Sequence, residues 1–194
     1  MSIWIGHGLR PEHRTAAALL YWQAFGGKLG RVMGPEPKAL RFIERVMSER
    51  HVITAFDATG QLLGVIGYRT HGGSFVGGDR HDLAAVYGRV GAAWRNACLA
   101  VLASDQEARV MIVDGLAVSA TARGMGVGAA LIEALCREAQ ARGYRELRLD
   151  VVGENLRARA LYERLGFQVQ RRSDSRLTAL IFGFHTAFVM ARTL

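Results

Sequence analysis

Cysteine and proline are scarce in this chain of 194 residues, which has two cysteines and three prolines. Cys98 and Cys136 cannot build a disulfide scaffold or a zinc site by themselves, and both fall in helix-like stretches where a buried free thiol is the usual interpretation. The histidines are dispersed without the spacing of metal ligands, so the sequence predicts no metal. No proline-rich linker, repeat or low-complexity tract marks a domain boundary. We therefore expect a single domain over residues 1–194.

Long hydrophobic runs are absent as well. The longest apolar stretch, residues 177–191, is broken by Thr178, His185 and Thr186 and is shorter than the about 20 residues that a membrane helix needs, so it favours strands. The first residues, MSIWIGHGLRPEH, lack the basic start and apolar run of a secretory signal. Half of the residues are nevertheless hydrophobic, which is enough for a core. The sequence predicts a globular, cytoplasmic protein that does not cross a membrane.

Lysine is nearly missing from a strongly basic chain. Lys28 and Lys38 are the only lysines among 25 cationic residues, and the formal net charge is +8. Arginine suits phosphate and carboxylate groups, so a polyanionic partner is plausible. However, the arginines are scattered through every predicted element, and the short cluster of Arg171, Arg172 and Arg176 has no aromatic residues between its members, which is typical of a solvated loop. Nucleic-acid binding is therefore not expected.

Hydrophobic periodicity and turn residues predict a mixed α/β fold. Apolar side chains at steps of three and four, together with helix-start and helix-end signals, predict helices over residues 11–25, 35–50, 81–103, 126–142 and 155–165. Strands are expected over residues 3–8, 52–56, 62–70, 109–118, 147–151, 167–171 and 184–192, and a glycine-rich loop over residues 26–34.

Residues 71–103 are longer than a simple hairpin connection and form an unusual helical insertion in this prediction. The expected helix carries an apolar face with Tyr87 and Trp94, which some other surface must cover. Three roles stay open for the segment. It could roof a pocket for a substrate, form a homodimer interface, or pack on the core of its own domain.

The most informative segment is VSATARGMGVGAALIEAL, residues 118–135, where a strand end precedes a short turn rich in glycine and then a helix. Glycines let the backbone approach an anion, and the unpaired N–H groups and the dipole of the helix start attract it. A tight turn with close helix packing would use the same residues. The segment lacks the Gly-Lys-Ser/Thr of a Walker loop. It loosely meets a dinucleotide fingerprint through Gly124, Gly126, Ala129 and Asp150, but that fingerprint is expected after a first strand.

A second cluster, LRLDVVGENLRARALYERLGF over residues 147–167, places Asn155 and Tyr162 seven residues apart, on one face of a helix. Together with the R-G-M-G-V-G of residues 123–128, this cluster resembles the GNAT superfamily of acetyl-coenzyme A-dependent N-acetyltransferases, over residues 109–167. The resemblance implies an α/β domain with a mixed, mostly antiparallel central sheet flanked by helices on both faces. It also implies acetyl transfer from acetyl-coenzyme A to a primary amine.

The resemblance further implies which residues would bind the coenzyme. Backbone groups of one strand would pair with the pantetheine arm, and these belong to Leu116, Ala117 and Val118. The pyrophosphate would be held by backbone amides after the turn, which are those of Met125, Gly126, Val127, Gly128 and Ala129. Arg123 and Gly124 of the turn itself would lie beside it. Asn155 would contact the pantetheine region. Tyr162 would approach the sulfur and protonate the leaving thiolate, a role that its hydroxyl can fill.

The implied chemistry is direct attack of the amine, with the Val118 amide as the oxyanion donor. The general base stays open. Some family members use a glutamate six residues before the valine, and here that position is Ile112, a departure. Others use a carboxylate twelve residues before the tyrosine, which is Asp150 here, and Asp114 is a third choice because it lies four residues before Val118 on the same strand face. The remaining candidates are an ordered water, His71 and His81.

The acceptor is expected to be a small amine, an amino acid or a peptide N-terminus, because a cationic protein is a poor host for polycations. The alternative function is a coenzyme A-binding sensor or partner protein that has lost catalysis.

Overall fold

The computed structural model describes residues 2–102 and 107–194, and these residues form a mixed α/β fold. Its strands make one sheet with the order β1-β2-β3-β5-β6-β8-β7, and β4 pairs with β3. Neighbouring strands are antiparallel except β5 and β6, which are parallel. The mixed, mostly antiparallel sheet is therefore confirmed. The strands are β1 (Trp4–His7), β2 (Val52–Phe56), β3 (Leu62–Thr70), β4 (Gly73–Ser74), β5 (Val110–Val118), β6 (Glu146–Val152), β7 (Gln168–Asp174) and β8 (Thr186–Thr193).

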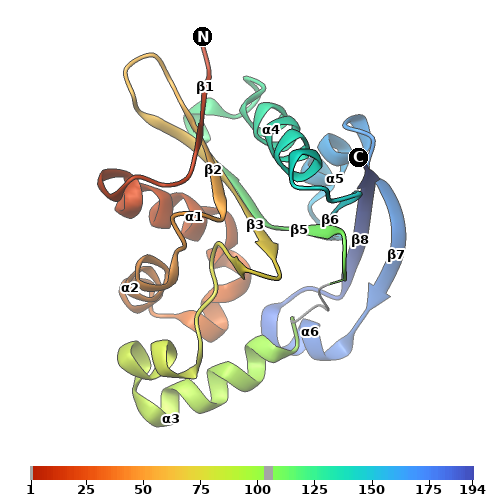
Figure 1. The fold of residues 1–194 in the computed structure, drawn as a ribbon. Helices are drawn as coiled ribbons and strands as arrows, with labels where there is room; N and C mark the ends of the chain where they lie inside the picture. Colours follow the sequence, from red (N-terminus) through yellow and green to blue (C-terminus); the bar gives the residue numbers. More distant parts are fainter. Residues whose placement is uncertain (1, 103–106) are drawn as a thin grey trace.

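Helices cover both faces of the sheet, as predicted (Figure 1). One face is covered by α4, in which Leu131 and Leu135 are fully buried. The opposite face is covered by α1 and α2, which bury Ala18 and Phe42. The described helices are α1 (Arg14–Met33), α2 (Glu36–Val46), α3 (Arg80–Ala100), α4 (Val127–Ala141), α5 (Leu156–Arg164) and α6 (Arg176–Phe182), with short 3-10 turns at Pro11–His13 and Ala120–Ala122. The part of the chain that the structure describes contains no helix long and apolar enough to cross a membrane.

Alternation along the central strands divides the interior into two hydrophobic cores. On β3, Ile66 packs in the core under α4, whereas its neighbour Val65 packs in the core under α1 and α2. Successive side chains of a strand point to opposite faces, so a strand that is buried on both faces must be apolar at nearly every position. This requirement explains the continuous apolar run LLGVIG in β3.

The expected loop over residues 26–34 is wrong, because α1 continues to Met33. The apolar spacing does not stop at the glycines: Leu29 packs partly buried against the core, and Val32 and Met33 are buried in it. Each glycine inside a helix costs about 1 kcal/mol relative to alanine, whereas burying a large apolar side chain contributes about 1.5–3 kcal/mol. Burial of this stripe therefore outweighs the low helix propensity of the glycines. The next helix is shorter than predicted and ends at Val46.

The C-terminal prediction also needs correction. Residues 177–191 were expected to form strands, but their first part belongs to α6. The sequence carried the signals for this helix: the Ser175 side chain accepts a hydrogen bond from the backbone of Thr178, and Gly183 ends the helix with φ 81°. The basic cluster is exposed to solvent as predicted, but it is not a loop, since Arg171 and Arg172 lie on β7 and Arg176 begins α6.

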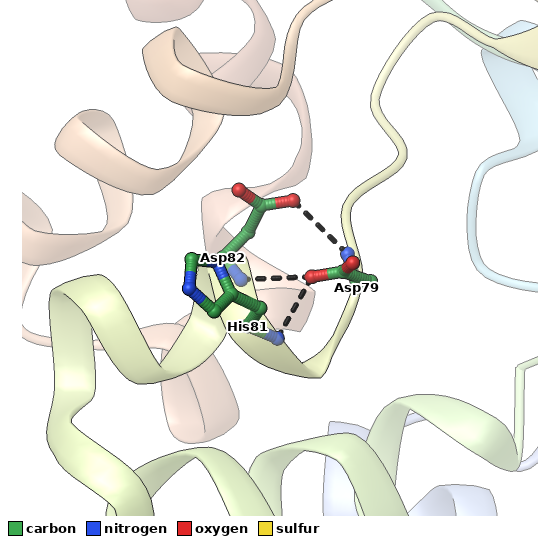
Figure 2. A group of neighbouring side chains, drawn as sticks. All are labelled: Asp79, His81 and Asp82. Carbon is green, nitrogen blue, oxygen red and sulfur yellow. Dashed lines mark hydrogen bonds between the residues drawn. The ribbon is translucent and has the colours of Figure 1, made fainter.

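The described part of segment 71–103 contains β4 and α3, which is kinked at Gly88. Residue 103, the predicted end of the helix, lies outside the described residues. The helix begins with a capping box, in which the Asp79 carboxylate accepts the N–H groups of His81 and Asp82 at 2.7 and 2.9 Å (Figure 2). The Tyr87 hydroxyl then donates to the backbone oxygen of Met33 at 2.6 Å. Thus α3 packs on its own domain, which was one of the three open roles.

Candidate active site

The site begins where two parallel strands separate. Pairing between β5 and β6 is confined to Val110–Ile112 of β5 and Glu146–Arg148 of β6. Beyond these residues β6 still pairs with β8, so the facing edges of β5 and β6 lose each other as partners. A cleft of about 600 Å³ opens at this point, and it is lined by β5 from Val113 and by β6 from Leu149.

The open edge of β5 presents backbone donors to this cleft. The N–H of Ser119 donates to the Leu63 oxygen of β3 at 2.8 Å. In an antiparallel pair, hydrogen bonding to one neighbour alternates along the strand. The N–H groups of Leu116 and Val118 therefore point away from β3, toward the edge that β6 has left. Both residues line the cleft, whereas the side chain of Ala117 is buried in the core under α1 and α2.

The glycine turn leads into a helix start that no side chain caps. Gly124 and Gly126 have φ of 82° and 83°, a left-handed conformation that favours glycine. Gly126 is the N-cap of α4 and offers no side-chain oxygen, so the first N–H groups of the helix remain available at its positive end. These groups belong to Val127, Gly128 and Ala129, which all line the cleft. The glycine turn and the uncapped helix start are thus present, and their role in binding an anion stays a prediction.

Gly128 also has a structural role. A Cβ at this position would lie 3.3 Å from Leu161 Cδ2 of α5, and the next nearest atom belongs to Leu116 of β5. The missing side chain lets α4, α5 and β5 approach each other closely at the mouth of the cleft. Close packing therefore accounts for Gly128, and anion binding by the glycine turn stays a prediction.

Cationic side chains also line this cleft. Arg123 lines the cleft as predicted, and Arg157 and Arg164 of α5 line it too, although sequence reasoning missed both. The helical spacing could have found them, because they lie on the face of α5 that carries Leu161. Met125 is 52% exposed and does not line the cleft with its neighbours.

Tyr162 and Asn155 both line the cleft, but their surroundings differ. Tyr162 is only 8% exposed, with its ring centroid 5.8 Å from that of Phe167. Burial raises the pKa of Tyr162 to about 12, so its hydroxyl keeps its proton near neutral pH and can donate it. The Asn155 side-chain oxygen accepts the Ala158 N–H at 3.2 Å and caps α5, which leaves the amide nitrogen for other partners.

The Asp114 carboxylate is already fully engaged. It accepts the Arg69 guanidinium at 2.9 Å through one oxygen and the Val76 N–H at 3.0 Å through the other, and its side chain is 5% exposed. Asp114 is also the extra residue of a β-bulge, since Gly115 pairs with Gly67 and Val113 with Tyr68. The prediction that Asp114 and Val118 share a strand face assumed regular alternation of side chains, and the bulge interrupts that alternation. Asp114 ties the segment after β4 to the strand.

Asp150, unlike Asp114, has neither an arginine nor a backbone N–H as a hydrogen-bond partner among the described residues. No hydrogen bond or ion pair joins its carboxylate to another described residue, and its expected neighbour Arg148 is paired with Glu107 and Glu146 at 2.6 and 2.9 Å. The carboxylate keeps contact with solvent through the open cleft, but the protein around it raises its pKa above the ordinary value. The positive charges of Arg171, Arg148 and Arg69 lower that pKa without cancelling the effect of burial. Of the two carboxylates, Asp150 is thus the one without a hydrogen bond or ion pair to a described residue, and its role as the base stays a prediction.

The other candidates for the base lie elsewhere. Ile112, at the position of the family glutamate, is 4% exposed. His71 and His81 are exposed and line neither of the clefts described in this section. His81 belongs instead to a group with Asp79 and Asp82 whose potential ligand atoms lie within 4.8 Å of one another (Figure 2). The capping box accounts for this group, and Asp82 also accepts the Arg45 guanidinium at 2.9 Å.

Helix α1 contributes a wall that the sequence did not reveal. A Cβ at Gly115 would lie 2.9 Å from the Phe25 ring and 3.1 Å from the Tyr21 ring, so the glycine lets both rings lie directly against β5. Phe25 and the half-buried Lys28 thereby line the cleft. Both residues lie in or beside the stretch that was expected to be a loop.

A second cleft of about 680 Å³ meets the first at the strand separation. The residues that line both clefts are Phe25, Lys28, Val113, Asp114, Asp150, Val151 and Val152. The second cleft extends away from α4 and α5, between α1, α2, α6 and the last turns of α3. Asn96 and Leu99 of α3 line it, so part of the insertion forms its wall.

Comparison with known families shows to which family the chain belongs. The model of the acetyltransferase (GNAT) family matches residues 19–167, most of the chain. The chain belongs to this family. Solved structures of GNAT proteins share its fold. A GCN5-related N-acetyltransferase from Kribbella flavida is 19% identical, with a TM-score of 0.64 over 99% of this chain and 98% of that one.

Two further solved structures have a fold similar to that of this GNAT chain. The ribosomal-protein-S18-alanine N-acetyltransferase from Escherichia coli is 18% identical, with a TM-score of 0.61 over 99% of this chain and 94% of that one. A chain of the NatC complex bound to Gag peptide and CoA is 18% identical, with a TM-score of 0.61 over 100% of this chain and 99% of that one. The search of curated proteins found no match.

Proposed function

We propose that this GNAT protein is an N-acetyltransferase that moves the acetyl group of acetyl-coenzyme A to a primary amine. The observation that carries the proposal is the first cleft, where the open edge of β5 meets the uncapped start of α4. Tyr162 lines the same cleft. This combination offers an extended thioester arm a strand to pair with and its pyrophosphate a cluster of N–H donors. The coenzyme in the related NatC structure supports the same choice of cosubstrate.

The coenzyme is expected to lie along β5 and across the helix start. Backbone groups of Leu116 and Val118 pair with the pantetheine arm, and the first amides of α4 bind the pyrophosphate. Arg123, Arg157 and Arg164 add positive charge around these amides. The thioester then lies near the strand separation, within reach of Tyr162.

The reaction proceeds by direct attack. Asp150 accepts a proton from the amine, and the amine nitrogen forms a bond to the acetyl carbon. The Val118 N–H stabilises the negative charge that develops on the carbonyl oxygen. As the carbon–sulfur bond breaks, the electron pair goes to sulfur and Tyr162 donates a proton to it. Asp150 then releases its proton to solvent and Tyr162 takes one up, which returns both groups to their starting states. The products are the acetylated amine and free coenzyme A, and no covalent intermediate forms on the protein.

The test measures binding and turnover separately. Calorimetry with coenzyme A and acetyl-coenzyme A is expected to show binding, and release of free thiol in the presence of primary amines is expected to show transfer. Absence of binding at millimolar concentration would overturn the proposal. Binding without turnover over a broad panel of amines would instead favour a catalytically silent coenzyme-binding protein, which the departure at Ile112 makes a real alternative.

A further inference from the structure

We infer that the amine acceptor has a bulky, apolar body, preferably aromatic, and that this body lies in the second cleft while its amine reaches Asp150. The inference rests on the proposed function, because it assigns the acceptor of that reaction. It starts from the continuity of the two clefts, which share Asp150 and the adjoining residues of β6. An acceptor that enters from the second cleft therefore brings its nitrogen to the side of the strand separation opposite the coenzyme.

The walls of the second cleft are mainly apolar and come from many elements. Aliphatic side chains of α3 form one side, including Leu83 and Leu99. A volume of about 680 Å³ is typical of sites that enclose a whole small molecule, not only an amine with a short chain. The cleft also contains six aromatic residues, which are Tyr21, Trp22, Phe25, Phe42, Phe182 and Phe184.

The charges of the second cleft favour one amine on the acceptor. Its cationic residues are Lys28, Arg69 and Arg171, and its carboxylates are Asp114 and Asp150. Asp114 is neutralised by Arg69, so Asp150 is the one carboxylate of this lining without an ion pair to a described residue. A second positive charge on the acceptor would have Lys28 and Arg171 as neighbours and no free carboxylate. An apolar monoamine avoids this repulsion, whereas a polyamine does not.

The last turns of α3 provide a place to test the inference without disturbing the reaction. Leu99 lines the second cleft and is only half-buried, although it packs against the core under α1 and α2, so Leu99→Asp needs a companion variant that removes no apolar packing. Val90 of the same helix is 84% exposed and lines neither cleft, so it offers a matched control. The exposed Asn96 also lines the cleft, and Asn96→Asp adds a charge there without removing apolar packing.

The experiment measures kcat/KM for 2-phenylethylamine, ethanolamine and spermidine by release of coenzyme A. Burial of a phenyl group predicts a preference of about 10- to 100-fold for 2-phenylethylamine over ethanolamine, and spermidine is expected to be the poorest acceptor. Leu99→Asp and Asn96→Asp are expected to lower kcat/KM for 2-phenylethylamine by about tenfold or more while KM for acetyl-coenzyme A is unchanged. Val90→Asp is expected to change neither value.

Equal rates for the three amines, or an unchanged preference in both cleft variants, would overturn the inference and leave the proposed function standing. Calorimetric binding of 2-phenylethylamine gives a second readout that needs no turnover. Binding that is weakened by Leu99→Asp but accompanied by no acetylation of any amine would refute the proposed function and retain the ligand class. Absence of both binding and acetylation would refute both.

Discussion

The two clefts of this GNAT protein are built in opposite ways. The first presents backbone N–H groups, exposed by a strand separation and by glycines at the start of α4. The second is walled by large side chains from α1, α2, α3 and α6. Backbone donors bind any ligand of the right shape and charge, whereas a side-chain wall selects by its residues. One cleft can therefore be common to a family while the other distinguishes its members.

This difference also separates what each cleft tolerates. A side chain added to the first cleft changes the path of the backbone, because Gly124 and Gly126 need positive φ. A side chain changed at a half-buried or exposed position of the second cleft, such as Leu99 or Asn96, requires no change in the path of the backbone. Asp150 lies at the junction of the two clefts, so substitutions at Asp150 and at positions farther from the junction test whether the clefts have separate roles.

The largest effect is expected for Asp150→Asn. Loss of the base should lower kcat by about 10²- to 10⁴-fold at neutral pH while the dissociation constant of acetyl-coenzyme A stays the same. Steady-state kinetics and calorimetry measure the two quantities. A variant that keeps wild-type kcat with its best amine would remove Asp150 from the mechanism and shift attention to an ordered water.

The same substitution should stabilise the fold at neutral pH. Burial raises the pKa of Asp150 in the folded state above its unfolded value, so the folded protein holds this proton more tightly than the unfolded chain. The destabilisation by the ionised carboxylate is absent below the unfolded pKa, grows as pH rises, and is complete above the folded pKa. We expect Asp150→Asn to melt at a higher temperature than wild type at pH 7. Scans toward pH 4 should show the two melting temperatures converging.

The pH dependence of turnover tests the same carboxylate by another route. On the acid side, kcat/KM should fall about tenfold per pH unit as Asp150 becomes protonated, with a midpoint above the ordinary aspartate value. This limb should be missing from the residual activity of Asp150→Asn. An identical acid limb in both proteins would assign the titration to another group, such as the amine itself.

A smaller effect, about 100-fold in kcat, is expected for Tyr162→Phe. The ring is buried against Phe167, so phenylalanine preserves the packing and removes only the proton donor. The affinity for coenzyme A should stay near that of wild type. The loss should shrink when the acetyl donor has a more acidic thiol, because such a leaving group needs less help from a proton. A uniform loss with every donor would indicate a structural role.

The contrast between the clefts also explains what could be predicted from sequence. The first cleft comes mostly from a few continuous segments, so the glycine turn and the spacing of Asn155 and Tyr162 indicated much of its lining through the family resemblance that they carry. The second joins residues as distant as Trp22 and Phe184, whose proximity depends on the whole fold. Asp114 illustrates the limit, because its ion pair with Arg69 follows from pairing between β3 and β5 and leaves no local signal.

The two errors in the fold have different origins. The glycines of α1 indicated a loop until tertiary burial of Val32 and Met33 overrode their propensity. In contrast, α6 had local signals on both sides, at Ser175 and Gly183, which the apolar run between them obscured. Local rules were therefore most reliable where the function itself depends on backbone conformation.

The smallest expected effect concerns the rim of the first cleft. Arg123→Gln should weaken coenzyme A binding by about fivefold at low salt, because one exposed charge near a phosphate contributes about 1 kcal/mol. The loss of affinity should be smaller in high salt, where exposed charges are screened. Arg41→Gln is the matched control, since it removes the same charge from an exposed position of α2 that lines neither cleft. Equal losses in the two variants would mean that the net charge of the protein attracts the coenzyme. A loss confined to Arg123→Gln would mean that the backbone N–H groups of the first cleft need a charged side chain beside them to bind the coenzyme. Both clefts would then depend on side chains for binding, and the difference between them would be smaller than their linings indicate.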